Sequence, residues 1–255
     1  MSRFPITIDQ ETVQIGTTAE LAVALDVLQG QYDRVVLTQL QPHLARIIRQ
    51  AKDLFTVMKS LSADDQVFLI QALGADLAGI MQDATHLRDL LATLADEKVE
   101  TALLSTLGTD GLRCLILNAE ELSEVLEWVY GQTDELALEL IGLDHIRDLA
   151  RNALDLSMIL RSLDPGLQEK LVDQLGWEFC VALVHDGRDL AYLLRALPAT
   201  TSERLLKHFD RVTLARLIGN SRDWAYLYQR LEPAEAEFIT HLLGLKQNRR
   251  NSHAA

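Results

Sequence analysis

The chain has 255 residues, of which 48% are apolar and 24% charged, so it is long and apolar enough to bury a sizeable core. Its formal net charge of −13 disfavours nucleic acid and anionic membrane as partners, because phosphate binding depends on clustered Lys and Arg. Aromatic residues are few and Leu and Ala are abundant, which favours packed helices over sheets.

Residues 1–16 differ from the rest of the chain. The stretch FPITIDQETVQI alternates polar and apolar residues and contains Pro5, which predicts either an extended segment or an imperfect first turn. Terminal units of helical repeats are commonly atypical, so we expect residues 1–16 to be an N-terminal cap segment that shields the core. The opening lacks the apolar core of a signal peptide and no apolar run could span a bilayer, which predicts a cytoplasmic protein.

From residue 17 a repeat of about 34 residues dominates the chain. An apolar anchor residue opens the first helix of each unit, at Leu21, Leu54, Leu87, Leu122, Leu156, Leu190 and Trp224. A closing apolar residue ends the second helix, at Leu40, Leu73, Leu107, Ile141, Leu175, Phe209 and Leu243. From Leu73 onward the closing residues are always 34 positions apart, which chance would not produce.

Helix-start signals repeat in the same register. A cap residue stands four positions before each anchor, at Thr17, Gln50, Asp83, Asn118, Asn152, Asp186 and Asn220. An acid stands three positions after nearly every cap, at Glu20, Asp53, Glu121, Asp155, Asp189 and Asp223, with His86 as the exception. This spacing is that of a capping box, in which both side chains bind backbone N–H groups. Acids such as Asp186 beside His185 are therefore interpreted as helix caps rather than catalytic groups.

The second helix of each unit has its own boundaries. We expect it to start at Ser62 with Asp65, Thr200 with Glu203, Asp164 with Pro165, and Glu232 with Pro233. It should end at glycine, which adopts the left-handed conformation that closes a helix, at Gly74, Gly108, Gly142, Gly176 and Gly244, with Asp210 in the sixth unit. A third, shorter apolar segment then follows in most units, as in LARIIR and CVALVH.

These patterns predict an all-α fold, a right-handed α-solenoid of about seven 34-residue three-helix repeats, the first of them partial. The solenoid should form a single domain over residues 17–245, because short helices are not stable alone and each unit must pack on its neighbours. Residues 246–255, KQNRRNSHAA, form a basic and polar tail that we expect to be disordered.

The three-helix unit and its leucine spacing resemble the armadillo and HEAT class of α-solenoids, whose repeats are usually longer. The string DLAYLLRALPATTSERLLKHF from Asp189 is similar to helix pairs in the cytosolic domains of bacterial magnesium transporters and flagellar motor switch proteins. The likeness lies in the leucines and includes no specific functional residue, so it implies only the binding of other macromolecules on an extended surface. The 34-residue length is also that of the DNA-reading repeats of plant-pathogen effectors, but their base-reading residues are absent and the charge has the opposite sign.

No sequence motif points to catalysis or to a cofactor. The chain has no P-loop, dinucleotide-binding glycine motif, H-E-x-x-H, paired C-x-x-C or EF-hand loop. His43, His86, His145, His185, His208 and His241 fall in different units, without the spacing that would hold a metal from one helix. Cys114 and Cys180 lie on apolar turns two units apart, which predicts buried thiols rather than a disulfide. We therefore expect no catalytic residue, metal or cofactor.

The fourth unit departs from the repeat, and it is the first candidate partner surface. Its first helix, ELSEVLEWVYG, places Glu120, Glu124 and Glu127 in one stripe, and residues 109–142 carry one base and eight acids. Two interpretations remain open. The stripe is either a solvated helix face or a docking strip for a basic segment of a partner, with Trp128 and Tyr130 as anchors.

A second candidate surface is the last unit, where Tyr226 and Tyr228 cluster near Trp224. Trp224 takes the anchor position and so should be core, whereas the two tyrosines cannot both point the same way as Trp224. We expect an aromatic surface near the C-terminal end, which would contact a partner or a second copy of the chain.

The sequence thus predicts a non-catalytic protein-binding scaffold or adaptor that uses an extended, mainly acidic surface. One alternative is an enzyme or small-molecule-binding protein with an unrecognised site in the concave groove, which a pocket with titratable groups outside the cap positions would support. A further alternative, nucleic-acid binding by a HEAT-like groove, needs a continuous basic face, and only the arginines of the last two units offer one.

Overall fold

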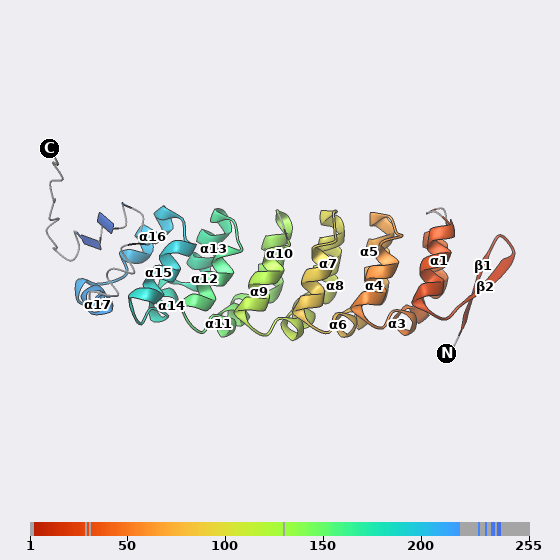
Figure 1. Cartoon of the computed structure of the whole chain (residues 1–255), viewed down its shortest axis with the longest axis horizontal. Coiled ribbons are helices and arrows are strands. Elements are labelled where there is room, and N and C mark those ends of the chain that lie inside the picture. Colours follow the sequence, from red (N-terminus) through yellow and green to blue (C-terminus); the bar gives the residue numbers. More distant parts are fainter. Residues whose placement is uncertain are drawn as a thin grey trace, which may run out of the picture. The chain divides into compact units, whose positions relative to one another are not determined.

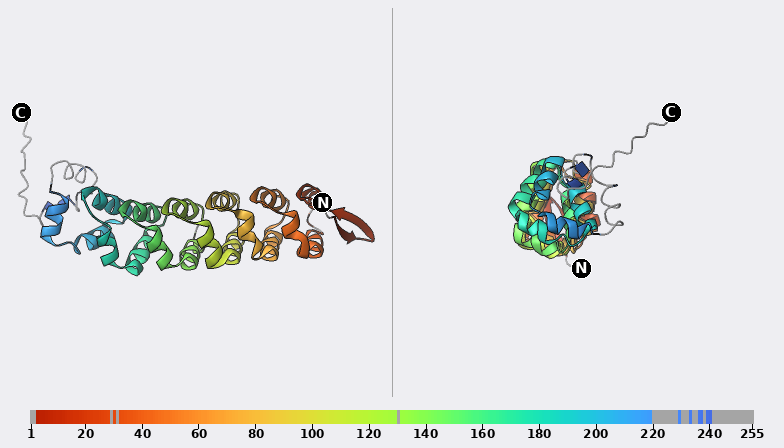
Figure 2. Two further views of the ribbon diagram at one scale, coloured as in Figure 1. Left: turned by 90° about the horizontal axis from the view of Figure 1, so that it is seen from below. Right: turned by 90° about the vertical axis from the view of Figure 1, so that its left-hand side faces the viewer.

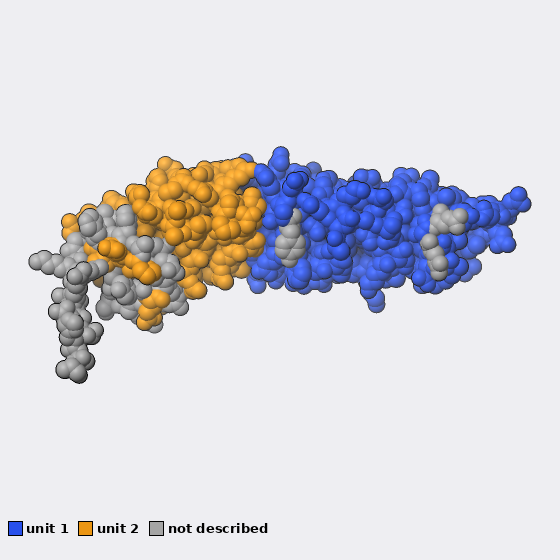
Figure 3. Space-filling model, turned by 90° about the horizontal axis from the view of Figure 1, so that it is seen from above, with its two compact units in different colours: residues 1–145 blue, residues 146–255 orange. Residues whose placement is uncertain are grey.

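The computed structural model describes residues 3–219 apart from 29, 31 and 130, together with 229, 233, 236, 237, 239 and 240. Helices account for most of the described residues, with one two-stranded sheet at the N-terminal end (Figure 1). The all-α prediction is confirmed apart from this sheet. The chain divides into two compact units, residues 1–145 and 146–255 (Figure 3). Within the described ranges, no helix has the length and apolar character needed to cross a bilayer.

Most elements of the first unit are helices of one to three turns. The strands and helices are β1 (Phe4–Ile8), β2 (Glu11–Ile15), α1 (Thr18–Leu28), α2 (Asp33–Leu40), a short 3₁₀ turn (Gln41–His43), α3 (Leu44–Ile47), α4 (Ala51–Met58), α5 (Ala63–Leu73), α6 (Asp76–Met81), α7 (Ala84–Leu91), α8 (Glu97–Leu115), α9 (Ala119–Leu126) and α10 (Gln132–Ile141). Helix α11 (Leu143–Leu149) crosses the boundary at residue 145.

The second unit continues with helices of similar length. They are α12 (Ala153–Arg161), α13 (Pro165–Leu175), α14 (Trp177–Ala182), α15 (Gly187–Ala196), α16 (Ala199–Leu206) and α17 (Arg211–Leu217). Helices α12 and α15 pack on each other, and α16 contacts both α14 and α15.

In the first unit the helices pack in two rows, which Figure 2 shows from below. The first helices of successive repeats contact one another in the order α1, α4, α7 and α9. The second helices do so in the order α2, α5, α8 and α10. The anchor leucines Leu21, Leu54, Leu87 and Leu122 are fully buried between these rows. Burial of each leucine contributes about 1.5 to 3 kcal/mol, so packing between neighbouring units supplies the stability that short helices lack alone.

The predicted helix caps are confirmed at most described positions. The side chains of Asp83, Asn118, Asn152 and Asp186 accept hydrogen bonds from backbone N–H groups of the first helical turn. Gln50 forms no such side-chain bond, and Asn220 lies outside the described residues.

The acid three residues after the cap also reaches back, but its target differs from that of a standard capping box. Glu121, Asp155 and Asp189 accept from the N–H of the residue that precedes the cap, at 2.7 to 3.1 Å. Each acid thereby ties the entering chain to its helix, so these carboxylates are occupied by structural bonds.

The second helices begin as predicted in two of four places. Ser62 caps α5 and its hydroxyl donates to Asp65, while Asp164 caps α13 ahead of Pro165. The prediction of a cap at Thr200 with Glu203 is wrong. Helix α16 begins one residue earlier, after Pro198, which forms no side-chain cap bond. Proline fixes its own φ near the helical value and so sets the start of the helix ahead of the threonine. Glu232 lies outside the described residues.

The glycine helix ends are confirmed within the described range. Gly74, Gly142 and Gly176 follow the last residue of α5, α10 and α13 with positive φ. Gly108 has φ of 59° and a non-helical ψ, so α8 consists of two helices that meet at a kink. Gly244 lies outside the described residues.

Gly142→Ala should lower the free energy of unfolding by about 1 to 2 kcal/mol. The residue has φ of 80°, and a Cβ there would lie 2.9 Å from Nη2 of Arg113, whose Nε donates to the carbonyl of Ile141. Urea unfolding would measure the loss. The matched control is Gly79→Ala inside α6, where a Cβ meets nothing within 4 Å, and it should stabilise by about 0.5 to 1 kcal/mol. A destabilisation as large at Gly79 would contradict this account.

Strands β1 and β2 form a β-hairpin, so the extended alternative is confirmed for the stretch from Phe4 to Ile15. Asp9 and Gln10 both have positive φ, which is the geometry of a type I′ hairpin turn. The side-chain amide of Gln39 on α2 donates to the carbonyl of Thr7 at 2.9 Å and accepts from its N–H at 2.8 Å. Phe4 stacks on His43 at 4.0 Å, and Ile6 and Ile15 are buried, so the hairpin covers part of the core.

Candidate functional site

Helix α9 carries the first predicted surface, and its buried side explains why it is a helix. Asn118 accepts from the N–H of Glu121 at 2.9 Å, and Leu122, Val125 and Leu126 are buried. The apolar residues recur at helical spacing and face the core. The glutamates between them are therefore left on the outer side of the helix.

Of the two predicted partner anchors on the fourth repeat, the structure describes Trp128. Val129, 1% exposed, occupies the buried position that other units give to leucine, whereas Trp128 is 39% exposed. Glu120 and Glu127 are exposed as well, and Leu117, ahead of the cap, is 63% exposed. Tyr130, Tyr226 and Tyr228 lie outside the described residues. The structure thus displays an exposed indole directly after the exposed Glu127 in the chain.

Glu124 differs from the other two glutamates because it has a cation for a partner. Its carboxylate forms an ion pair of 2.8 Å with Arg88 of α7, which also binds Asp89. This contact joins two neighbouring first helices, and it splits the stripe into the exposed Glu120 and Glu127 and a neutralised centre. We call the set Glu120, Glu127 and Trp128 the α9 surface.

The second unit contains an aromatic and ionic cluster that sequence reasoning missed. Arg204 of α16 binds Glu169 at 2.6 Å and Asp173 at 2.7 Å, and its guanidinium lies 4.9 Å from the centre of the Trp177 ring. Trp177 in turn stacks on His208 at 5.1 Å. The acids four residues apart on one helix face were the available signal. Arg204 therefore forms two ion pairs that join α16 to α13.

Buried carboxylates outside the cap positions are the groups that an enzyme interpretation would need. Asp33, Glu100 and Asp134 are buried, and each lies seven residues before the closing residue of its unit. The same position in the other described units holds Gln66, Gln168 and Ser202. We call this series the inner polar positions. Their common register gives these acids a structural explanation.

The amides at the inner polar positions show what that position does. Gln168 Nε2 donates to the carbonyls of Leu160 and Leu163, both at 2.9 Å, and Gln66 donates likewise to Met58 and Leu61. The bonds join the start of the second helix to carbonyls at the end of the first, and two of these carbonyls, of Met58 and Leu160, also accept a backbone N–H three residues on.

A carboxylate at an inner polar position cannot donate in this way when it is ionised. Burial raises the pKa of Glu100, the carboxylates of Glu97 and Asp96 raise it further, and the hydroxyl of Thr133, which donates at 3.0 Å, opposes them. Burial also raises the pKa of Asp33, with Asp65 adding to the effect and the N–H of Gly30 opposing it. Both shifts are towards the protonated form, which is the only form of a carboxyl group that can donate a hydrogen bond.

The cavity in the second unit offers little to a catalytic interpretation. A hollow of about 400 Å³ is lined by Val181, Val184, His185, Phe209, Thr213 and Arg216. The His185 ring hydrogen-bonds the carbonyl of Leu183 at 3.0 Å, while Asp189 nearby is occupied as a cap acid. Nothing in this arrangement pairs a nucleophile with a base.

The cysteines and metal-ligating groups are dispersed. Cys180 is buried, and burial raises the pKa of its thiol to about 11. The prediction that Cys114 is buried is wrong: its side chain is exposed, because it falls on the outer face of the short helix after Gly108. Across residues 3–219 and the few described beyond, apart from the gaps given above, no three His, Cys, Asp or Glu side chains are grouped as a metal site.

Comparison with known proteins finds no matching family model, no matching curated protein and no matching solved structure.

Proposed function

We propose that this chain is a protein-binding scaffold or adaptor without catalysis of its own, built as a right-handed α-solenoid of about seven 34-residue repeats and acting in the cytoplasm. The observation that carries the proposal is the exposed Trp128, which follows Glu127 directly after the end of α9, a helix whose buried side is occupied by Leu122, Val125 and Leu126. An exposed indole next to charge is typical of residues that concentrate binding energy at protein interfaces.

Two further observations support a binding role. The acids that could suggest a catalytic site either form hydrogen bonds at helix starts or occupy the inner polar positions. Both are structural positions of the repeat. The region around α9 carries one base against eight acids between residues 109 and 142. Such a surface attracts a basic segment and disfavours phosphate or acidic ligands.

The test is affinity capture on the immobilised protein, with elution at low and then high salt. We expect a basic partner that elutes with salt, is lost from Glu120→Lys/Glu127→Lys, and binds Trp128→Ala about tenfold more weakly. Glu124 is left unchanged because its reversal would also break the Arg88 pair. The matched control is Asp76→Lys/Asp148→Lys, which makes the same charge change at exposed acids outside residues 109–142. Retention of the partner by the α9 double variant would refute the role of this surface.

A further inference from the structure

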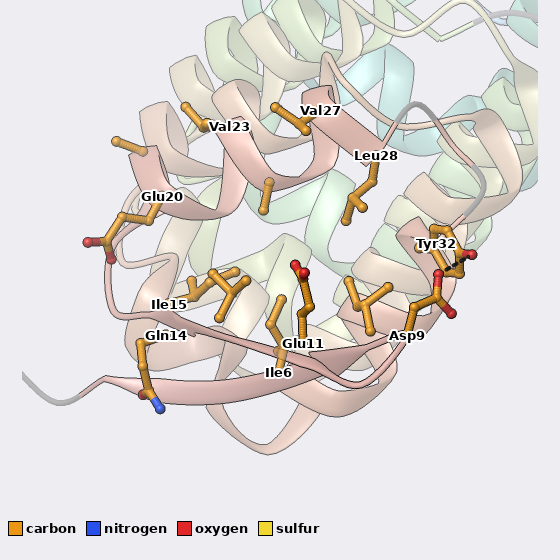
Figure 4. Close-up of a pocket in the computed structure, with 14 residues that line it drawn as sticks. Ile6, Asp9, Glu11, Gln14, Ile15, Glu20, Val23, Val27, Leu28 and Tyr32 are labelled. Carbon is orange, nitrogen blue, oxygen red and sulfur yellow. Dashed lines mark hydrogen bonds between the residues drawn. The ribbon is translucent and has the colours of Figure 1, made fainter.

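A groove of about 880 Å³ lies between the β-hairpin and α1. Its walls are the apolar face of the hairpin, with Ile6, Val13 and Ile15, and the face of α1 that carries Val23 and Val27 (Figure 4). Val13, Val23 and Val27 are 50%, 63% and 72% exposed. These side chains line the groove without filling it, so apolar surface remains open to water.

The repeat does not require these valines. The position of Val23, two after the anchor, is Thr56 in α4, Asp89 in the α7 unit and Glu124 in α9. The position of Val27, six after the anchor, is Ser60, Thr93 and Trp128 in the same units. Most of these residues are polar, as expected on a solvent-facing side. The first repeat alone has valines at both positions, beside the apolar face of a hairpin. Folding of the repeat does not account for this apolar surface.

The packing of α1, α4 and α7 indicates what shape of ligand fits the groove. Helix α4 packs on α1, and α7 packs on α4. From the second repeat on, the first helix of a repeat therefore has the first helix of the preceding repeat beside it. Helix α1 has the hairpin at that side instead (Figures 1 and 2). The groove runs beside α1, whose 11 residues span about 16 Å. A partner helix of two to three turns would lie in the groove against α1, in the way that α4 lies against α1 on its other side.

Charge at the groove selects among apolar ligands. Residues 1–33 contain one base, Arg3, and five acids. Arg3 is paired with Glu20 at 3.0 Å, and Asp9 accepts from the hydroxyl of Tyr32 at 2.7 Å. Within the described ranges, Glu11 at the groove has neither an ion pair nor a side-chain hydrogen bond. An acidic rim repels fatty acids and anionic lipids and favours Lys or Arg.

We propose that this groove is a docking site for an amphipathic helix of another protein, with an apolar face flanked by Lys or Arg. The apolar face would cover Val13, Val23 and Val27, and the flanking cations would meet Glu11 and the other rim carboxylates. This proposal rests on the protein-binding function given above, because its ligand is a protein, and it names the kind of protein segment that binds. The α9 surface takes no part in the groove, so either proposal can fail without the other.

The test uses a fluorescein-labelled synthetic peptide of Leu, Ala and Lys, with Leu at i, i+3, i+4 and i+7 and Lys at both ends. Fluorescence anisotropy should show saturable binding to the full chain that weakens with salt. A peptide of identical composition in scrambled order, and one with Glu in place of Lys, should bind roughly tenfold or more weakly. Equal binding of the scrambled peptide would overturn the proposal, as would no binding of the ordered one.

Groove variants locate the binding. Val23→Glu/Val27→Glu should weaken binding roughly tenfold or more, whereas Leu154→Glu/Val212→Glu, the same change at exposed apolar residues of the second unit, should leave it unchanged. If the glutamates lower the melting temperature, Val23→Thr/Val27→Ser substitutes the residues of the next repeat, Thr56 and Ser60, and should still weaken binding. Unchanged binding by a folded groove variant would overturn the proposal.

Sedimentation distinguishes a foreign helix from a second copy of the chain. The proposal expects the same sedimentation coefficient for the wild-type chain and for Val23→Glu/Val27→Glu across the concentration range. A wild-type dimer that Val23→Glu/Val27→Glu converts to monomer would show that a second copy covers the groove, and would overturn the assignment of a partner protein.

Discussion

Replacing Leu156 by alanine should lower the free energy of unfolding by about 2 to 5 kcal/mol. Leu156 is fully buried at the anchor position of α12, so truncation removes apolar contacts and leaves a cavity that neighbouring helices only partly fill. Denaturant unfolding followed by circular dichroism would measure the loss. A change in the m-value would indicate that the substitution alters how cooperatively the repeats unfold.

Two nearby substitutions calibrate that effect. Asn152→Ala removes the cap that accepts from the N–H of Asp155 at 2.9 Å, and should cost about 1 kcal/mol. Leu154→Ala removes a leucine that is 43% exposed, and should cost less than the anchor. A larger loss at Asn152 than at Leu156 would mean that the repeat register assigned to this chain is incorrect.

Gln168→Glu should lower the free energy of unfolding by about 2 to 3 kcal/mol at pH 7. The amide donates to two backbone carbonyls, and an ionised carboxylate in its place would lose both bonds and face the two acceptor oxygens. Urea unfolding at several pH values would measure the loss. Gln132→Glu, the same change at an exposed residue of α10, should alter stability by no more than about 0.5 kcal/mol.

The pH dependence of this loss has a definite sign. The introduced carboxyl should have a higher pKa in the folded chain than in the unfolded chain, because the protonated form alone can donate. Its penalty is absent below the unfolded pKa of about 4.3 and grows as the pH rises through the folded pKa. Glu100→Gln should behave conversely: it should stabilise by about 1 kcal/mol at neutral pH, with the gain lost as the pH falls through the raised folded pKa and absent below the unfolded pKa of about 4.3. A loss at Gln168 that does not vary with pH would contradict the donor role.

The features that the sequence predicted correctly are those fixed by neighbours three or four residues apart. Caps such as Asn152 with Asp155 and helix ends such as Gly142 depend on local hydrogen bonds and local backbone conformation, so spacing alone reveals them. The start of α16 was missed because Pro198, just outside the assumed box, decides where that helix begins.

The features that escaped prediction depend on partners about one repeat away. Arg88 lies 36 residues before Glu124, and nothing local to the glutamates reveals that one of them is neutralised. The hairpin was left open because Asp-Gln is not among the favoured dipeptides of a type I′ turn.

The amide of Gln39 that pairs with Thr7 imitates a neighbouring strand. An unpaired strand edge is a template on which other chains add strands, and this is how many proteins begin to form fibrils. At Thr7 both outward-facing backbone groups of β1 are already taken by one side chain from the same molecule. A single glutamine thus occupies the edge of β1 at this point, where another chain would otherwise find an open N–H and an open carbonyl.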